Sequence, residues 1–335
     1  MTNLQQFPLP ADLRAILRCP SCGSALNDRP RGLECVSCAT YFPVVDNVVR
    51  FVQAEKYAGS FGFQWKVYAR TQLDNETSRE SEDDFRNRTG LEPQDLHGKL
   101  VLDVGCGMGR FADIASRWGA RVVGVDLSAA AEVAARNLAD REAVRIFRAD
   151  VFSLPFAPES FDYIYSLGVL HHTPNCEQAF RRLPRLLKPG GTVILWVYSG
   201  YNRWYRMSDL YRQVTHRISS RGLHALCHVA VPLYYVHKGL RRVPGVGRPA
   251  SRLLHCALPI SLHPNAAMRV LDTFDWYSPN YQSKHTYEEV FRWFESSGLE
   301  NLRVLHEPIS VRGCRPIETL AADGDGNNFV ESQAS

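Results

Sequence analysis

Apolar runs that end in polar residues alternate with amphipathic segments through the middle of the chain. Apolar runs within residues 101–110, 121–128, 144–156, 161–174 and 186–198 predict five buried strands. The segments between them predict helices, and this alternation is typical of an α/β fold with a largely parallel, Rossmann-like sheet. Residues 301–312 predict a closing strand pair, which brings the expected sheet to seven strands.

The link between the first strand and its helix is rich in glycine. In the sequence VLDVGCGMGR, residues 101–110, Asp103 ends the apolar run, and Gly105, Gly107 and Gly109 follow at alternate positions. Such a turn lets the backbone approach a ligand closely, and the first N–H groups of the helix then face that ligand without partners. A glycine loop by itself fits several nucleotide-binding folds, including that of a dehydrogenase.

Two acidic residues at strand ends narrow the choice of ligand. Asp126 ends the second run, about 20 residues after the glycines, where a carboxylate can accept hydrogen bonds from two ribose hydroxyls. Asp150 ends the third run, where it can reach an adenine amino group. A Pro-Gly-Gly turn at residues 189–191 leads into the fifth strand. Together with the Gly-x-Gly-x-Gly spacing, these features disfavour a dehydrogenase.

In these ordered motifs the chain resembles the class I S-adenosylmethionine-dependent methyltransferases, particularly their type 11 group, over about residues 61–312. The resemblance implies S-adenosylmethionine as cofactor, with Asp103 near its methionine amino group, Asp126 at its ribose and Asp150 at its adenine. The full set of residues expected at the cofactor is Asp103, Gly105, Gly107, Gly109, Asp126, Leu127, Asp150, Val151 and Ser166.

A compact cysteine pattern lies near the N-terminus. Cys19 and Cys22 form one C-x-x-C pair, and Cys35 and Cys38 form a second, with 12 residues between the pairs. Two such pairs can present four thiolates to Zn²⁺ in a closed, structural site, whereas a redox dithiol needs only one pair. Residues 17–52 resemble the zinc-ribbon activators of tRNA- and protein-methylating enzymes. We expect a zinc ribbon over residues 1–55, either as a folding staple or as a docking module.

The aromatic residues after the ribbon suggest a cap. We expect residues 56–95 to link the two domains and cover the cofactor, with Phe63, Trp65 and Tyr68 either stacking over the sulfonium or packing the domains together. Residues 74–88 are strongly charged and predict a solvated helix.

Catalytic candidates lie beyond the fourth strand and in the loop expected at residues 274–285. His171 and His172 fall on the carboxyl edge of the sheet, where a base or an acceptor-orienting group belongs, although His171 would equally suit packing and capping. An Asp-Trp-Tyr-Ser-Pro stretch, residues 275–279, resembles a loop of bacterial type 11 enzymes. The acceptor-site candidates there are Asp275, Tyr277, Tyr281 and His285. Capping boxes or caps are expected at Asn175 with Gln178, and at Thr286 with Glu289.

A long insertion separates the fifth strand from the closing pair. Within the expected methyltransferase domain, residues 96–320, the insertion spans residues 199–285, and its segment 201–262 holds ten Lys or Arg residues and one acid, Asp209. Three interpretations stay open: a helical lid over a small-molecule acceptor, a membrane-surface element or a nucleic-acid arm. The tail, residues 321–335, is rich in small polar residues and predicts disorder.

Composition adds only broad limits. The 335 residues carry a net charge of +4 and are 45% hydrophobic, and no apolar run approaches the roughly 20 residues of a membrane span. The first residues lack a signal-peptide pattern, and five cysteines lie scattered outside the ribbon, so we expect a reducing cytoplasm.

The function expected is methyl transfer to a small biosynthetic intermediate. A lipid, a quinone or RNA is the alternative acceptor, and a cofactor-binding module that docks a partner through the ribbon is the non-enzymatic alternative. The acceptor atom and the oligomeric state are left open by the sequence.

Overall fold

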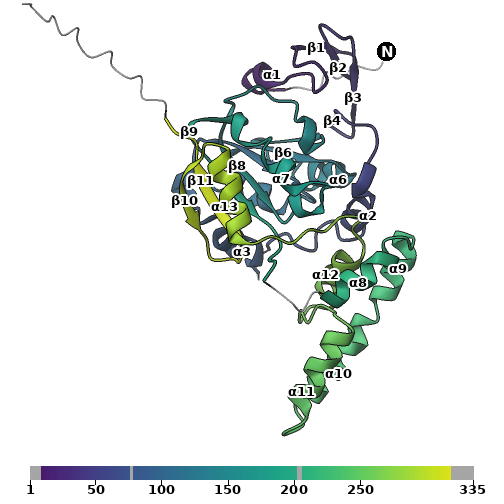
Figure 1. Ribbon diagram of the computed structural model, residues 1–335. Helices are drawn as coiled ribbons and strands as arrows, with labels where there is room; N and C mark the ends of the chain where they lie inside the picture. Colours follow the sequence, from purple (N-terminus) through teal and green to yellow (C-terminus); the bar gives the residue numbers. More distant parts are fainter. Residues whose placement is uncertain (1–8, 76–77, 202–205, 318–335) are drawn as a thin grey trace, which may run out of the picture.

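The computed structural model describes residues 9–75, 78–201 and 206–317, so the tail expected at 321–335 lies outside the described residues. An eleven-stranded sheet runs through the molecule in the order β1-β2-β3-β4-β7-β6-β5-β8-β9-β11-β10 (Figure 1). Its strands are β1 (Leu26–Arg29), β2 (Gly32–Cys35), β3 (Tyr41–Val45), β4 (Val48–Arg50), β5 (Leu100–Val104), β6 (Arg121–Asp126), β7 (Val144–Arg148), β8 (Phe161–Leu167), β9 (Leu187–Trp196), β10 (Glu300–Val304) and β11 (Ser310–Cys314).

The seven strands β5 to β11 form the sheet expected from the sequence. Strands β5 to β9 pair in parallel, and β11 lies antiparallel between β9 and β10. The turn expected at residues 189–191 lies within β9, where the pairing register with β8 shifts. The Rossmann-like α/β prediction is therefore confirmed for this part of the chain.

The expected count of seven strands is too low because the ribbon joins the same sheet. β4 pairs in parallel with the edge strand β7, with Val49 opposite Phe147. Phe42, Phe51 and Phe147 lie in a row across this junction, with ring centroids 5.0 and 6.0 Å apart. Pairing with β4 satisfies backbone N–H and C=O groups of β7 that an open edge strand would leave exposed. The hydrophobic periodicity within one strand does not indicate which strand it pairs with, so the sequence did not predict this contact.

Helices cover both faces of the seven-stranded part. α3 (Glu80–Thr89), α5 (Arg110–Arg117) and α6 (Ala130–Asn137) pack on one face, whereas α7 (Cys176–Phe180) and α13 (Tyr287–Ser296) pack on the other, where Phe180 stacks on Phe294. The caps expected for α7 and α13 are present: the Asn175 side chain accepts from the Gln178 backbone N–H, and Thr286 and Glu289 form a capping box.

Helix α3 differs from the solvated helix expected over residues 74–88. Phe85 is fully buried against Phe111, Trp118 and Tyr165, and Glu82 is buried beside Trp118. Some of its charged residues form ion pairs: Asp84 pairs with both Arg88 and Arg110. The many charged residues of α3 suggested a solvated helix, although its one large apolar side chain, Phe85, is buried in the core.

Short helices connect the ribbon to the sheet domain. α1 (Ala11–Ile16) precedes the ribbon strands, and Leu17 forms an isolated bridge with Phe156 after β7. Beyond β4, η1 (Lys56–Ala58) and α2 (Gly59–Val67) pass over the sheet edge toward α6, and α4 (Pro93–Leu96) leads into β5.

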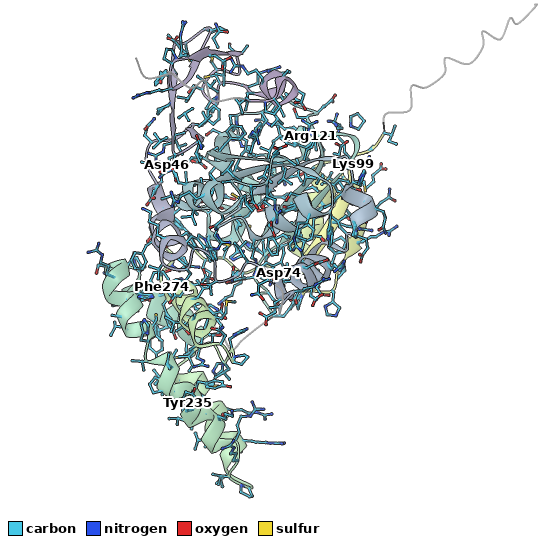
Figure 2. All side chains as sticks on the ribbon, turned by 180° about the vertical axis from the view of Figure 1, so that it is seen from behind. Asp46, Asp74, Lys99, Arg121, Tyr235 and Phe274 are labelled. Carbon is cyan, nitrogen blue, oxygen red and sulfur yellow. The ribbon has the colours of Figure 1, made fainter. Side chains whose placement is uncertain are left out.

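The insertion is helical, as expected. It comprises α8 (Arg206–Thr215), α9 (Ser220–Cys227), α10 (Ala230–Leu240), α11 (Gly247–Ala257) and α12 (Ala266–Tyr277). α12 packs on α8, α9, α10 and α2, around a separate apolar cluster that includes Phe274 and Leu271. The hairpin of α10 and α11 extends away from the sheet, with Tyr235 far from Phe274 (Figure 2). Within the described residues no helix combines the length and apolar character needed to cross a bilayer.

Candidate active site

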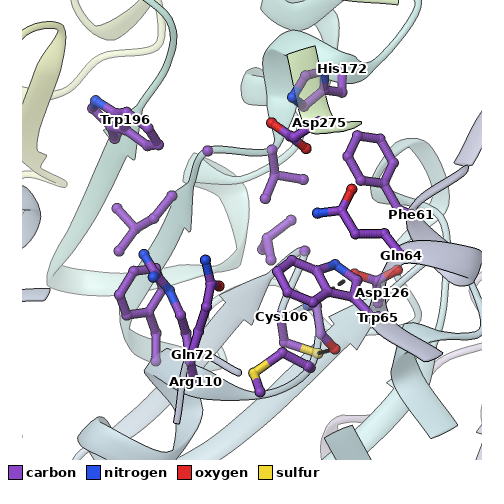
Figure 3. Close-up of a pocket in the computed structure, with 18 of the residues that line it drawn as sticks. Phe61, Gln64, Trp65, Gln72, Cys106, Arg110, Asp126, His172, Trp196 and Asp275 are labelled. Carbon is purple, nitrogen blue, oxygen red and sulfur yellow. Dashed lines mark hydrogen bonds between the residues drawn. The ribbon is translucent and has the colours of Figure 1, made fainter. Parts of the chain in front are cut away.

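A cavity of about 580 Å³ opens at the carboxyl ends of the central strands (Figure 3). The loops that follow β5, β6, β7, β8 and β9 all contribute to its wall, which is where open α/β sheets bind ligands. Helices α2, α3 and α12 supply the remaining wall, through Trp65, Asp84 and Asp275 among others. Its volume is typical of a small-molecule site.

The glycine loop forms the floor of this cavity. Gly105 has φ +82°, and a Cβ there would lie 2.3 Å from a methyl group of Val169. Gly107 has φ +54°, and a Cβ there would lie 3.2 Å from the indole nitrogen of Trp65. Both glycines line the cavity, so the bare backbone leaves space that a side chain would fill.

Gly109 has a different role from the one expected. It precedes α5 with φ +95°, and a Cβ there would lie 2.8 Å from Leu138, at the end of α6. It is absent from the cavity wall, so its place in the expected cofactor set is not supported. The third glycine lets α5 begin tightly against its neighbour.

Asp126 presents a carboxylate to the cavity in a prepared orientation. One oxygen accepts from the Gly107 backbone N–H at 3.0 Å, and the other accepts from the backbone N–H and the hydroxyl of Ser128, each at 2.8 Å. Burial raises its pKa, while the Ser128 and Gly107 donors oppose that shift. Leu127 lines the cavity beside it.

Asp103 lies deeper than the sequence suggested. It is buried beneath the loop and is not part of the cavity wall, and one of its carboxylate oxygens has no partner among the described residues. Burial raises its pKa to about 8, Asp126 adds to the rise, and the neighbouring Tyr165 hydroxyl opposes it. This carboxyl is therefore poised for a cationic partner that would favour its charged form.

Two other expected cofactor residues are already engaged. Asp150 is buried, forms an ion pair with Lys56 at 2.6 Å and caps Phe152, while its neighbour Val151 lines the cavity. Ser166 is fully buried and donates to the carbonyl of Val104 at 2.9 Å. Ser166 ties two strands together and lies outside the cavity wall, so its expected role at the cofactor stays a prediction without support from the cavity.

The aromatic residues of the expected cap lie in two different places. Trp65 lines the cavity over Gly107, and Phe61 and Gln64 from the same helix line it too. Phe63 packs on Phe274, and the Tyr68 hydroxyl bonds to His224 at 2.8 Å. Only Trp65 of the three expected residues therefore reaches the site.

The two histidines after β8 also lie in two different places, and one of them lines the cavity. His171 is fully buried, stacks on Tyr198 at 3.9 Å, and neither of its ring nitrogens has a partner among the described residues. Its burial lowers its pKa well below the usual value, and it does not line the cavity. His172 lines the cavity, bonds to the Tyr281 carbonyl through Nδ1 at 3.0 Å, and has a pKa lowered by burial to about 4.

Asp275 is the strongest proton acceptor at this end of the cavity. It projects from α12 near His172, Phe61 and Gln64 (Figure 3) and accepts from the Tyr198 hydroxyl at 2.8 Å. Burial raises its pKa to about 6, and the Tyr198 hydrogen bond opposes the rise. A carboxylate with this pKa is ionised at neutral pH and still basic enough to take a proton.

Other acceptor-site candidates lie elsewhere. The Asp-Trp-Tyr segment is the end of α12 rather than a loop, and the Tyr277 hydroxyl donates to the Pro259 carbonyl inside the insertion. His285 bonds to Ser283 and Glu289 and lines a second cavity between the α7 and α13 segments. Tyr281 lines that second cavity, and its ring meets Tyr57 edge to face.

Sequence patterns missed several residues of the wall. Trp196 ends the fifth strand and Tyr198 follows it, so the rule that ligands bind at carboxyl ends of strands would have found them. The other missed residues, which come from helices whose placement no motif signalled, are Tyr57, Phe61, Gln64, Met268, Leu271 and Asp272.

The four ribbon cysteines converge as their spacing predicts. Their sulfurs all lie within 4.8 Å of one another, with Cys19 and Cys38 3.6 Å apart and Cys22 and Cys35 3.4 Å apart. Tetrahedral Zn–S bonds of about 2.3 Å require S···S separations of about 3.8 Å. Backbone N–H groups of Ser37 and Cys38 point at the Cys35 sulfur, as they do toward thiolates.

Comparison with known proteins agrees with this geometry. Residues 102–195 match the family described as a methyltransferase domain. This segment of the chain is therefore similar to methyltransferase domains. Methyltransferase GfsG from Streptomyces halstedii is 38% identical over 105 residues, which are 29% of this chain and 37% of that protein. Phosphoethanolamine N-methyltransferase 2 from Caenorhabditis elegans is 35% identical over 109 residues, 31% of this chain and 25% of that protein.

The chain spans only a quarter to about a third of these two relatives, and the match centres on the methyltransferase domain. Among solved structures, a phosphoethanolamine N-methyltransferase 2 from Haemonchus contortus, bound to phosphomonomethylethanolamine and S-adenosylhomocysteine, is 18% identical. Its alignment covers 73% of this chain and 43% of that chain, with a TM-score of 0.41.

Proposed function

We propose that this protein is an S-adenosylmethionine-dependent methyltransferase that acts on a small molecule. The observation that carries the proposal is the cavity at the carboxyl ends of the strands, with Gly107 and Asp126 in its wall, inside the domain that matches the methyltransferase family. The names of the relatives mention phosphoethanolamine, sterols, ubiquinone biosynthesis and tRNA, which are chemically unrelated, so the acceptor class is inferred from the cavity.

The residues present suit the cofactor. Gly105 and Gly107 leave a backbone cradle, Asp126 presents carboxylate oxygens where ribose hydroxyls would donate, and Trp65 covers the loop. The orphaned carboxylate oxygen of Asp103 lies below, where the charge of a methionine amino group would favour its ionised form. When bound, the cofactor supplies an electrophilic methyl group on a sulfonium. For the adenine, Asp150 would have to exchange its ion pair with Lys56 for a ligand contact.

The remaining part of the cavity would hold the acceptor. Trp196, Tyr198, Met268 and Leu271 line it with apolar and aromatic surface, and α2, α3 and α12 restrict the space beside a nucleoside-sized cofactor. That space suits a small molecule or one end of a longer one. Asp275 then acts as the base that takes the acceptor proton, with Tyr198 holding the carboxylate in place.

The ribbon cysteines complete the proposal with a structural Zn²⁺. All four sulfurs lie within 4.8 Å of one another and would occupy the four positions of a tetrahedral site, so the ion would have no open position for chemistry. Its role is to hold a small domain that shares its core with the sheet.

Calorimetric titration with S-adenosylmethionine tests the function directly. We expect binding by the natural protein and a loss of at least about tenfold in affinity for Asp126→Ala, because a carboxylate that accepts from ribose hydroxyls is worth about 1.5–3 kcal/mol. Asp140→Ala is the matched control, since Asp140 lies on the surface after α6 and its side chain is 75% exposed. Absence of binding by the natural protein would refute the enzyme. Equal affinity in Asp126→Ala would refute the site.

A further inference from the structure

The hairpin of α10 and α11, residues 230–257, has an unusual surface. It contains five cations, Lys238, Arg241, Arg242, Arg248 and Arg252, and no acidic residue. All five are exposed, and within the described ranges none of them takes part in an ion pair, whereas Arg212 of the same insertion pairs with Asp209. The positive charge of the hairpin is therefore available to a partner.

An apolar stripe lies on an exposed face of α11, and its first residue, Val246, follows the turn that carries Arg241 and Arg242. Val246, Ala250, Leu253 and Ala257 recur at the spacing i, i+4, i+7 and i+11, which places them on one face of a helix. All four are exposed; Val246 is 70% and Leu253 is 72% accessible. The buried residues of α11, Gly247 and Ser251, lie on another face, so the helix is amphipathic toward solvent as well as toward α10.

The neighbouring helix and the connecting turn continue this surface. Tyr235 and Val236 on α10 are 63% and 47% exposed, and Val243 in the turn is 47% exposed between Arg242 and Pro244. The hairpin stands away from the sheet domain and contacts the rest of the insertion through α12 (Figures 1 and 2). Its outer side is therefore free of other described parts of the chain.

We propose that the α10–α11 hairpin docks on an anionic lipid bilayer. A bilayer interface takes up the apolar stripe at the boundary of headgroups and acyl chains, and anionic headgroups neutralise Arg241 and Arg242 in the turn at its end. The helices would lie on the surface, consistent with the absence of a described helix able to span it. This inference concerns where the protein is held and goes beyond methyl transfer.

Two other occupants fit the surface less well. A second copy of the hairpin would place five cations against five cations without a compensating acid. A nucleic acid would neutralise the arginines but leave Val246 and Leu253 in water, since phosphates gain nothing from aliphatic side chains. A bilayer alone satisfies both halves of the surface.

Co-sedimentation of the full chain with vesicles tests the proposal. We expect binding to vesicles of phosphatidylcholine mixed with phosphatidylglycerol, little binding to phosphatidylcholine alone, and weaker binding as salt rises. Arg241→Glu with Arg242→Glu should weaken binding at least about tenfold, because each cation near such a surface contributes about fivefold. Val246→Asp with Leu253→Asp should weaken it comparably at constant cation count.

The matched control replaces an exposed cation and an exposed aliphatic residue on β10. Arg303→Glu with Val304→Asp changes the same chemical types away from the hairpin and should leave vesicle binding within about twofold. All variants are first required to bind S-adenosylmethionine like the natural protein, which shows that they fold. The proposal is overturned by absence of binding to anionic vesicles, or by equal loss in the β10 control. It is also overturned if only single-stranded RNA binds and the aspartate pair leaves that binding unchanged.

Discussion

The ribbon and the insertion are both additions to a seven-stranded methyltransferase sheet, and they are attached in opposite ways. The ribbon adds β4 to the open edge of β7 and shares one hydrophobic core with the sheet, through residues such as Phe42, Phe51 and Phe147. The insertion packs around a separate apolar cluster at Phe274, which it shares with Phe63 and Tyr68, and its outer hairpin stands clear of the domain.

The two additions also differ in what they contribute to the cavity: the insertion lines it and the ribbon does not. In the described part of the chain, no residue between 9 and 55 lines the cavity. The loosely attached insertion supplies Met268, Leu271, Asp272 and Asp275 through α12. An addition that shares the hydrophobic core of the sheet is therefore expected to contribute to stability. An addition that lies at the carboxyl ends of the strands is expected to contribute to the site.

The largest effect should come from breaking the metal cluster. Cys35→Ser removes a buried ligand, and because structural zinc contributes on the order of 10 kcal/mol of binding free energy, the ribbon should unfold and expose the edge of β7. Denaturant unfolding should show a large loss of stability, and metal analysis about one zinc per chain before the change. Cys256→Ser makes the same replacement in the insertion and should be nearly silent. Equal effects at both positions would contradict the comparison.

The next effect tests whether the insertion takes part in catalysis. Asp275→Asn should lower kcat by about 10²–10⁴-fold, because a positioned base contributes that much. In the natural protein kcat should rise with pH through about 6, as the raised pKa of Asp275 is passed and the base loses its proton; His172, with a pKa of about 4, stays neutral there.

Tyr198→Phe sharpens that assignment. Its hydroxyl donates to Asp275 and holds the pKa down, so removal should shift the acidic limb of kcat to higher pH without abolishing turnover. A pH profile that keeps its limb in Asp275→Asn would exclude Asp275 as the base.

The smallest effect compares one valine in each addition. Val49→Ala in β4 deletes buried methyl groups opposite Phe147 and should cost about 2 kcal/mol, whereas Val246→Ala on the hairpin should change stability by less than about 0.5 kcal/mol. Urea unfolding of the two variants measures the difference. A cost for Val246→Ala equal to that for Val49→Ala would mean that the hairpin packs against something in solution.

Local patterns predicted the elements and the floor of the site well. The strands β5 to β9, the glycine loop, the caps at Asn175 and Thr286, and the convergence of the four cysteines all follow from spacing over a few residues. Each of these features depends on contacts between neighbours in the chain, which periodicity and turn chemistry describe directly.

Sequence patterns did not predict the surroundings of a residue whose type suits several different partners. Gly109 and Ser166 carry the right types at the right strand ends, yet one packs on Leu138 and the other bonds to Val104. The charge of α3 suggested a solvated helix, and one buried phenylalanine decided otherwise. Which of His171 and His172 faces the cavity depends on how the chain turns after β8.

By itself, the sequence predicted the parallel sheet, the backbone cradle of Gly105 and Gly107, the carboxylate of Asp126 and a four-cysteine cluster, because a local pattern of residues marks each of them. Only the tertiary structure decided that the ribbon extends the sheet through β4 and β7, that Asp275 reaches the cavity from a distant helix, and that the α10–α11 hairpin turns its cations and apolar stripe outward. These outcomes depend on which surfaces meet across long stretches of chain, and burial, which sets partners and pKa values alike, exists only once they have met.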